Sequence, residues 1–305
     1  GDTLVSGGVR LDWWTARNGE RTERNIVTGA PTLALAPADQ SAWAPTARAG
    51  LRRDLGDTYV RAAAYAGFRP PTLNELHRPF RVGNDVTEAN AALEPERLYG
   101  IDAAFGDDTG DVTWSVGVFA TRLVDPITNV TLGVGPGVFP PGVNVPAGGV
   151  YRQRRNAGEI DAAGVEADAR GAWGDALSWR AALSYTDARV DGGNDAPQLT
   201  GLSPAQAPQW SATAGVVWAP WRGGEVSADA RYESARFDDD QNTRRLNAAL
   251  TLDLRIEQML TQRAALFVAL DNALDTDVVT GATADGVALY GAPQTLRFGF
   301  TLRGT

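Results

Sequence analysis

Three residues able to bind a ligand lie close together in the sequence. His77 is the only histidine of the 305-residue chain, and Arg78 and Arg81 follow it on the same connection. An imidazole ring can ligate ferric haem, whereas guanidinium groups suit an anionic ligand. Polar side chains on connections are also commonly just solvated. We therefore predict His77, Arg78 and Arg81 as candidate ligand-binding residues, with haem, another anion and solvation as open alternatives.

The composition argues against several other chemistries. The chain has no Cys, so it forms no disulfide and no thiolate metal site. A catalytic triad needs a base held beside a nucleophile, and no nucleophile-elbow motif accompanies the single histidine. No Gly-rich phosphate loop follows a strand. The net charge of −9 argues against a nucleic-acid partner, because binding to phosphates needs a basic face. We expect no catalytic site, no metal and no cofactor.

Charged residues gather at two further places. Asp238, Asp239 and Asp240 form an acidic tract that is typical of a solvated loop, with a calcium site as the alternative. The second group combines basic residues before a strand with charged residues inside it. Its members are Arg152, Arg154, Arg155, Glu166, Asp168 and Arg170. We expect them to form an ion-pair network on the polar face of that strand.

The elements that position these residues show the two-residue period of β-strands. In the last segment, apolar residues at the even positions 296–302 alternate with polar residues and glycine at the odd positions. The same alternation occurs in twelve segments, and no segment has a helical period. The predicted strands are 3–14, 42–53, 57–68, 95–106, 111–122, 158–172, 177–186, 210–218, 226–233, 246–256, 262–272 and 295–303.

Short and long connections alternate along the whole chain. The short ones are 53–56, 106–110, 173–176, 219–224 and 257–261, and the long ones are 15–41, 69–94, 123–157, 187–208, 234–243 and 273–292. Outer-membrane barrels have this asymmetry between their two ends, whereas a soluble β-sandwich does not need it. Tryptophans also fall near strand ends, as at a water-lipid boundary. They are Trp13, Trp14, Trp43, Trp173, Trp210, Trp218 and Trp221.

Five motifs appear in a fixed order, and together they resemble the barrels of TonB-dependent receptors. The segment from Phe68 to Leu76 is similar to the family's FRxPTxxEL pattern, and the segment from Asn90 to Glu96 to its NPxLxPE pattern. Residues 156–166, 271–275 and 290–295 resemble three later family patterns. The motif residues are Phe68, Arg69, Pro70, Pro71, Glu75, Leu76, Asn90, Leu93, Pro95, Glu96, Asn272, Tyr290 and Pro293. Ala91 and Gln294 stand where the family has Pro and Arg.

Several motif residues have structural explanations of their own. Pro70 and Pro71 lack a backbone donor, which suits the point where strand pairing stops. Asn272 follows a strand and can hydrogen-bond its own backbone. We expect these residues to shape the rim of the barrel rather than to bind a ligand. His77 differs, because haem receptors of the family place a haem-ligating histidine in this region.

The resemblance implies a fold, a location and an activity. Family barrels have 22 strands and an N-terminal plug, so residues 1–305 would be the C-terminal portion of the barrel, with the plug and early strands missing. The expected fold is an all-β, antiparallel transmembrane barrel in the outer membrane of a Gram-negative bacterium. The implied function is active uptake of a scarce nutrient, first a ferric siderophore, then haem or cobalamin. Its partners would be that ligand, outer-membrane lipid and, through the plug, the periplasmic coupling protein TonB.

Two other classes of protein remain open. A stand-alone twelve-stranded passive pore or barrel enzyme would need neither plug nor TonB, and a soluble β-rich binding module would need no lipid. A sheet with unpaired edges in lipid leaves backbone groups without partners, so an isolated piece would have to close on itself or pair with another copy. The segment after Gly1 lacks the basic and apolar regions of a signal peptide.

Overall fold

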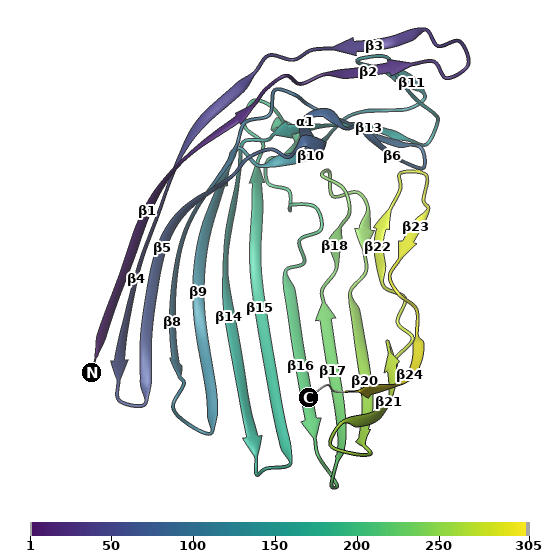
Figure 1. The fold of residues 1–305 in the computed structure, drawn as a ribbon. Coiled ribbons are helices and arrows are strands. Elements are labelled where there is room, and N and C mark those ends of the chain that lie inside the picture. The colour runs from purple at the N-terminus through teal and green to yellow at the C-terminus, as the bar shows by residue number, and fades with distance from the viewer. Residues whose placement is uncertain (1, 303–305) are drawn as a thin grey trace.

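Twelve long strands form one curved wall. The computed structural model describes residues 2–302, in which each of these strands pairs antiparallel with its neighbours in chain order (Figure 1). Their bounds are β1 Thr3–Ala16, β4 Gln40–Leu55, β5 Thr58–Arg69, β8 Glu96–Asp107, β9 Val112–Val124, β14 Glu159–Trp173, β15 Leu177–Asp191, β16 Trp210–Trp218, β17 Gly224–Glu233, β20 Ala249–Met259, β21 Ala264–Asp271 and β24 Thr295–Leu302. All twelve predicted strands are confirmed, although Arg303 of the last one lies outside the described residues.

The strand register sorts side chains onto two faces. Across β20, β17 and β16, for example, Leu252 is paired with Ala230, which is paired with Ala214. Such rows make one face apolar from edge to edge, and on it Val9 and Phe298 are 89% and 82% exposed. Apolar exposure across a whole sheet is typical of a lipid-facing surface. The opposite face carries polar side chains and glycine, and this is the inner face of the wall.

Two strands differ from their predicted ranges by more than one or two residues at an end. β15 continues past Thr186 to Asp191, because it keeps pairing with β14 as far as Glu159. Leu246, which we predicted at the start of a wall strand, instead lies in β19 (Arg245–Leu246) and is 1% exposed. The apolar alternation runs through the break between β19 and β20, so the sequence pattern could not indicate it.

The two ends of the wall differ, as predicted. Short turns join the strands at one end, and Gly56 and Gly174 in these turns have φ of +77° and +61°, which glycine adopts without strain. The long connections gather at the other end, at the top of Figure 1. We call this assembly of long connections the loop layer.

Aromatic pairs lie toward both ends of the wall. The ring centroids of Trp13 and Trp43 are 6.2 Å apart, and those of Trp173 and Trp179 are also 6.2 Å apart. Aromatic rings near the two ends of membrane-spanning strands suit the water-lipid boundary. Trp14 does not belong to either belt, because it alternates with Trp13 and therefore faces the inner side of the wall, where it is partly buried. Trp14 does lie near a strand end, as predicted, but its side chain is not on the lipid-facing surface.

The wall does not close on itself. β1 and β24 form its two edges, and no other described strand pairs with their free sides. Residues 2–302 thus form neither a smaller closed barrel nor a sandwich of two sheets. The arrangement is that of a partial barrel.

The loop layer has its own small sheet, which we call the loop sheet. Its strand order is β10-β13-β7-β6. The bounds are β6 Phe80–Val82, β7 Asp85–Glu88, β10 Ile127–Val134 and β13 Val150–Asn156. Four hairpins accompany it, formed by β2 Arg21–Arg24 with β3 Pro31–Leu35, β11 Gly137–Phe139 with β12 Val143–Val145, β18 Arg236–Phe237 with β19, and β22 Val279–Ala282 with β23 Ala288–Tyr290.

Two short helices were not predicted. Helix α1 (Leu73–His77) and the 3-10 helix η1 (Pro197–Leu199) are too short to show a helical period in the sequence. Thr72 begins α1 through a capping box with Glu75, whose carboxylate accepts the Thr72 backbone N–H at 2.7 Å. Among residues 2–302, no helix is long and apolar enough to cross a membrane.

Candidate functional site

Motif residues of β5, α1 and β8 form a polar cluster at the rim of the wall, which we call the rim network (Arg69, Glu75 and Glu96). Arg69 Nε donates to Glu96 Oε2 at 2.5 Å, and its two Nη atoms donate to Glu75 at 2.9 and 3.1 Å. The other oxygen of Glu96 accepts the backbone N–H of Ile127 at 2.6 Å. The rim network therefore ties the end of β5 to α1, β8 and β10.

Arg69 and Glu75 of the rim network are ionised near neutral pH. Burial raises the pKa of Glu75, but hydrogen bonds from Arg69 and Thr72 outweigh burial and hold this pKa below its ordinary value. Hydrogen bonds to Glu96 and then Glu75 raise the pKa of Arg69. Two apolar motif residues are buried, since Leu93 is completely buried and Leu76 is 2% exposed. The ion pairs of Arg69, Glu75 and Glu96 are contacts within the protein, whereas the motif residues Leu76 and Asn90 line the chamber described below.

The last motif residues lie between β21 and β24. Asn272 has a φ of +49°, and its side chain accepts from the Thr276 N–H at 3.0 Å and donates to the Thr276 carbonyl at 2.9 Å. This closure onto the backbone is the one expected from its place after a strand. Tyr290 is exposed at the end of β23, and Pro293 precedes β24. None of these three motif residues lines the chamber described next.

A chamber of about 560 Å³ lies inside the loop layer, between the β2–β3 hairpin, α1 and the loop sheet. This volume is in the range of small-molecule sites. Leu35, Leu132 and Pro141 contribute to an apolar lining. Phe139 lines it too and stacks on Tyr151, with ring centroids 4.8 Å apart. The chamber thus offers a flat apolar surface to a bound molecule.

Strand alternation places polar groups on the chamber side of the loop sheet. Tyr151, Gln153 and Arg155 share one face of β13 and line the chamber. Glu88 of β7 joins them, because it is paired in parallel register with Gln153. The Tyr151 hydroxyl donates to the Pro140 carbonyl at 2.5 Å. Burial, and then the charge of Glu88, raise the pKa of Tyr151, so its phenol stays neutral.

The three predicted ligand-binding residues lie at different places. His77 is the last residue of α1 and lines the chamber, and a Cβ added at Gly19 would come within 2.8 Å of its Cε1. Arg78 is exposed, and its carbonyl accepts from Arg154 Nη1 at 2.9 Å. Arg81 lies in β6 and borders a second cavity of about 690 Å³. The structure therefore places His77 in the lining of the chamber and Arg81 at the edge of the second cavity.

The ion-pair network that we predicted between β13 and β14 was wrong. Arg152 pairs with Asp85 of β7 at 3.0 Å, whereas Asp168 accepts the Ser115 hydroxyl at 2.5 Å within the wall. The reason is that β13 pairs with β7 and β10 in the loop sheet instead of extending the inner face of the wall.

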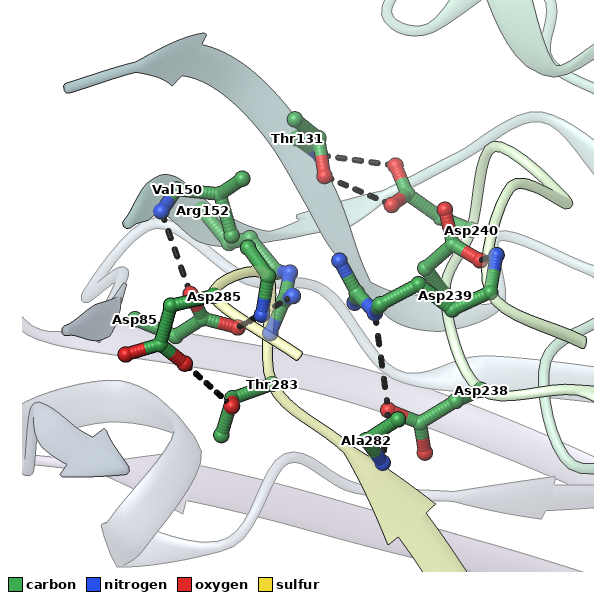
Figure 2. Close-up of polar contacts among 12 residues, drawn as sticks. Asp85, Thr131, Val150, Arg152, Asp238, Asp239, Asp240, Ala282, Thr283 and Asp285 are labelled. Atoms are coloured by element: carbon green, nitrogen blue, oxygen red, sulfur yellow. Dashed lines mark hydrogen bonds and ion pairs between the residues drawn. The ribbon is translucent and has the colours of Figure 1, made fainter. Parts of the chain in front are cut away.

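The acidic tract and Asp85 anchor the loops to one another (Figure 2). Asp240 accepts the backbone N–H and hydroxyl of Thr131 at 2.7 and 2.6 Å, which joins the β18–β19 connection to β10. Asp85 accepts the backbone N–H of Ala284 at 3.3 Å. Because Asp239 and Asp240 are only 4% and 7% exposed, the solvated-loop prediction was wrong. Among residues 2–302, no group of three acidic or histidine side chains could hold a metal ion.

Some chamber residues had no counterpart in the sequence analysis. Arg21 and Glu88 lie in strands of four residues, which are too short to show alternation. The spacing of Tyr151, Gln153 and Arg155 was the available clue, because alternate residues of a strand share a face. We had grouped Arg155 with Arg152, which lies on the opposite face of β13.

An open antiparallel wall with an apolar outer face and a one-sided loop layer is the architecture of part of a β-barrel of the outer-membrane type. The sequence matches the family model described as "TonB dependent receptor-like, beta-barrel" over residues 1–273. The chain therefore belongs to the TonB-dependent receptor β-barrel family. No curated protein matches the sequence.

Several solved structures are similar to this chain. The copper transporter OprC has a TM-score of 0.73 at 16% identity, covering 98% of this chain and 45% of that one. The siderophore receptor PiuA from Acinetobacter baumannii has a TM-score of 0.72 at 18% identity, covering 98% and 40%. The ferric yersiniabactin uptake receptor FyuA from Yersinia pestis has a TM-score of 0.71 at 18% identity, covering 98% and 43%. The chain thus spans less than half of each structure, and such identities show the fold alone.

Proposed function

We propose that the chain forms part of the wall and the external loop layer of an active transporter in the outer membrane of a Gram-negative bacterium. In this proposal the twelve strands are the C-terminal portion of a longer barrel, and TonB supplies energy through a plug inside it. Family membership supports the barrel and the coupling. The observation that carries the ligand-capture role is the chamber, which is lined entirely by residues of the long connections.

The proposed ligand is a ferric siderophore. Cationic and aromatic side chains line the chamber together, among them Arg21, Arg155 and Phe139. Guanidinium groups suit anionic oxygen-rich ligands, and aromatic faces suit flat apolar groups. The description of PiuA as a siderophore receptor and of FyuA as a ferric yersiniabactin uptake receptor also supports this class of ligand.

Growth of a deletion strain tests the proposal. With a ferric siderophore as the only iron source, loss of the gene should stop growth, and a plasmid copy should restore it. Deletion of TonB should have the same effect, because active uptake needs the coupling protein and a passive pore does not. Equal growth of the deletion strain and its parent in iron-poor medium would contradict the iron assignment.

Haem is the second candidate, because His77 and Tyr151 line the same chamber and both side chains can ligate ferric iron. The Tyr151 hydroxyl is less suited, since it donates to the Pro140 carbonyl and burial raises its pKa. Titration of the receptor with haem, followed by absorbance of the Soret band, separates the two ligands. If haem is the ligand, His77→Ala should raise the dissociation constant obtained from this titration at least tenfold. If a siderophore is the ligand, siderophore-dependent growth should survive the substitution.

A further inference from the structure

The β2–β3 hairpin is a separate element of the loop layer. Its two strands pair only with each other, and in Figure 1 they run across the top of the layer, above β11 and β13. Among the residues of β2 and β3, all except Arg21 and Leu33 are exposed. A two-stranded hairpin without a core of its own is only marginally stable. Contacts with the loops beneath it must therefore hold this hairpin in place.

One ion pair joins the hairpin to the loop sheet. Arg21 of β2 pairs with Glu88 of β7, and the two side chains are only 13% and 4% exposed. The other side-chain contacts of the hairpin are internal, since Arg21 also donates to Glu23, and Arg24 Nη1 donates to the Gly29 carbonyl at 3.5 Å. Within the described part of the chain, no second hydrogen bond or ion pair links 20–36 to the loop sheet.

This ion pair lies where two cavities meet. Arg21 and Glu88 line both the chamber and the second cavity of about 690 Å³. The hairpin also contributes Leu35 to the lining of the chamber, and Thr32 and Leu33 to the lining of the second cavity. It therefore forms one side of both cavities, and a movement of the hairpin away from the loop sheet would open both.

The connection between the hairpin and the wall has the features of a hinge. Strand pairing is interrupted on both sides of the hairpin, over residues 17–20 and 36–39. One hydrogen bond of the described residues crosses this gap, from the Asn18 N–H to Asp39 Oδ1 at 2.9 Å. Gly19 lies within the gap, and glycine adopts a wide range of backbone angles. Hinges are typically a few residues at the ends of elements, as here.

We infer that the β2–β3 hairpin is a lid over the chamber and the second cavity, held closed by the Arg21–Glu88 ion pair and hinged at 17–20 and 36–39. A molecule reaches the chamber after the ion pair separates and the hairpin lifts. The inference goes beyond the proposed function, because it concerns access to the cavities whatever the ligand is.

A distance measurement on the complete receptor, purified in detergent, tests the lid. Thr28→Cys and Val134→Cys, both at exposed positions, place one spin label on the hairpin tip and one on the loop sheet for pulsed electron paramagnetic resonance. Arg21→Met should increase the population at longer distances by roughly tenfold or more, since it removes one partner of a buried ion pair. Arg24→Met is the matched control and should keep the distances of the unsubstituted hairpin, because Arg24 bonds only within the hairpin, to Gly29.

Two further variants separate the ion pair from a general loss of packing. Glu88→Gln removes the other charge of the pair and should also release the hairpin, and it replaces Arg21→Met if that variant does not fold. Arg21→Lys keeps the charge and should remain mostly closed. Unchanged distances in both Arg21→Met and Glu88→Gln would overturn the inference, as would equal loosening by Arg24→Met.

Hydrogen exchange of the receptor without substitutions gives a second measurement. Amides of β2 and β3 should exchange about tenfold faster or more than those of β10 and β13, because a lid opens without unfolding the sheet beneath it. Equal protection of the hairpin and the loop sheet would contradict the lid. Neither measurement depends on transport, so this inference and the proposed function can fail independently.

Discussion

Arg69 explains, at the scale of single residues, why the first family motif contains an arginine and a glutamate and the second ends in a glutamate. Its planar guanidinium reaches Glu75 and Glu96 at once, which a single ammonium group could not do with the same geometry. Each contact ties a different segment to the end of β5. The motif therefore has a physical explanation that requires no ligand.

Arg69→Met should loosen the rim without unfolding the wall. Two carboxylates would lose their shared donor, and the free energy of local opening should fall by roughly 1–2 kcal/mol, a figure reduced because the Arg69 side chain is 43% exposed. Amide hydrogen exchange in 73–77 and at the start of β10 measures this. Arg52→Met is the control, because Arg52 also pairs with two carboxylates, Asp54 and Asp108, but at the short-turn end of the wall. Unchanged exchange in α1 would show that the rim network contributes little.

The carboxylate of Asp239 should make its loop sensitive to acid. Burial raises its pKa, but hydrogen bonds from Thr243 and Arg244 outweigh burial, so the pKa lies below the ordinary 3.8. A depressed pKa stabilises the folded loop fully above pH 3.8, and the contribution is lost as pH falls through the folded value. Exchange protection of 238–246, corrected for intrinsic rates, should therefore be flat from pH 5 to 7 and fall below about pH 4.

Asp239→Asn gives the matched comparison. It should lower protection of this loop by roughly 1 kcal/mol or more near neutral pH, because an amide cannot accept all the same hydrogen bonds. The difference from the wild-type protein should shrink at the lowest pH. A constant difference across the whole range would mean that the charge of Asp239 does not matter.

At the scale of elements, the alternation of apolar and polar side chains determined how much of the fold could be predicted from the sequence. The wall strands are long and amphipathic, so their existence and most of their ends follow from the two-residue period. The strands of the loop layer were not predicted, because β2 and β7 have only four residues each and β7 pairs with β13, which is distant in sequence. Asp240 likewise contacts Thr131 of β10, which no local pattern contains. His77 and Arg155 were noticed as residues, but their shared chamber was not.

A pair of adjacent substitutions in β15 tests the two faces of the wall. Leu183 is 45% exposed on the outer face and is paired with Ala167 and Ala212. Leu183→Arg should destabilise the membrane-embedded protein by roughly 2–4 kcal/mol, the cost of a cation near the middle of a bilayer. Ser184→Arg should cost far less, because Ser184 faces inward beside Glu166. Denaturant unfolding from lipid vesicles measures both, and equal losses would mean that the faces are misassigned.

At the scale of the whole molecule, the loop layer is one connected structure rather than six independent connections. Asp240 joins the β18–β19 connection to β10, and Asp85 joins β7 to the β22–β23 hairpin. The chamber lies against the same loop sheet. Loops that are coupled in this way should open together. A substitution near one anchor should therefore also lower the stability of segments more than a hundred residues away in sequence.

Asp240→Ala tests this coupling. The substitution leaves the Thr131 N–H and hydroxyl without their acceptor, which should cost roughly 1–3 kcal/mol of loop stability. Hydrogen exchange should accelerate in both 127–134 and 238–246, while β14 and β15 keep their protection. Thr131→Val removes the hydroxyl alone and should have a smaller effect, and the two losses should not add in the double variant. Additive losses, or acceleration in 238–246 alone, would mean that the loops open independently and that the chamber is not held by the acidic tract.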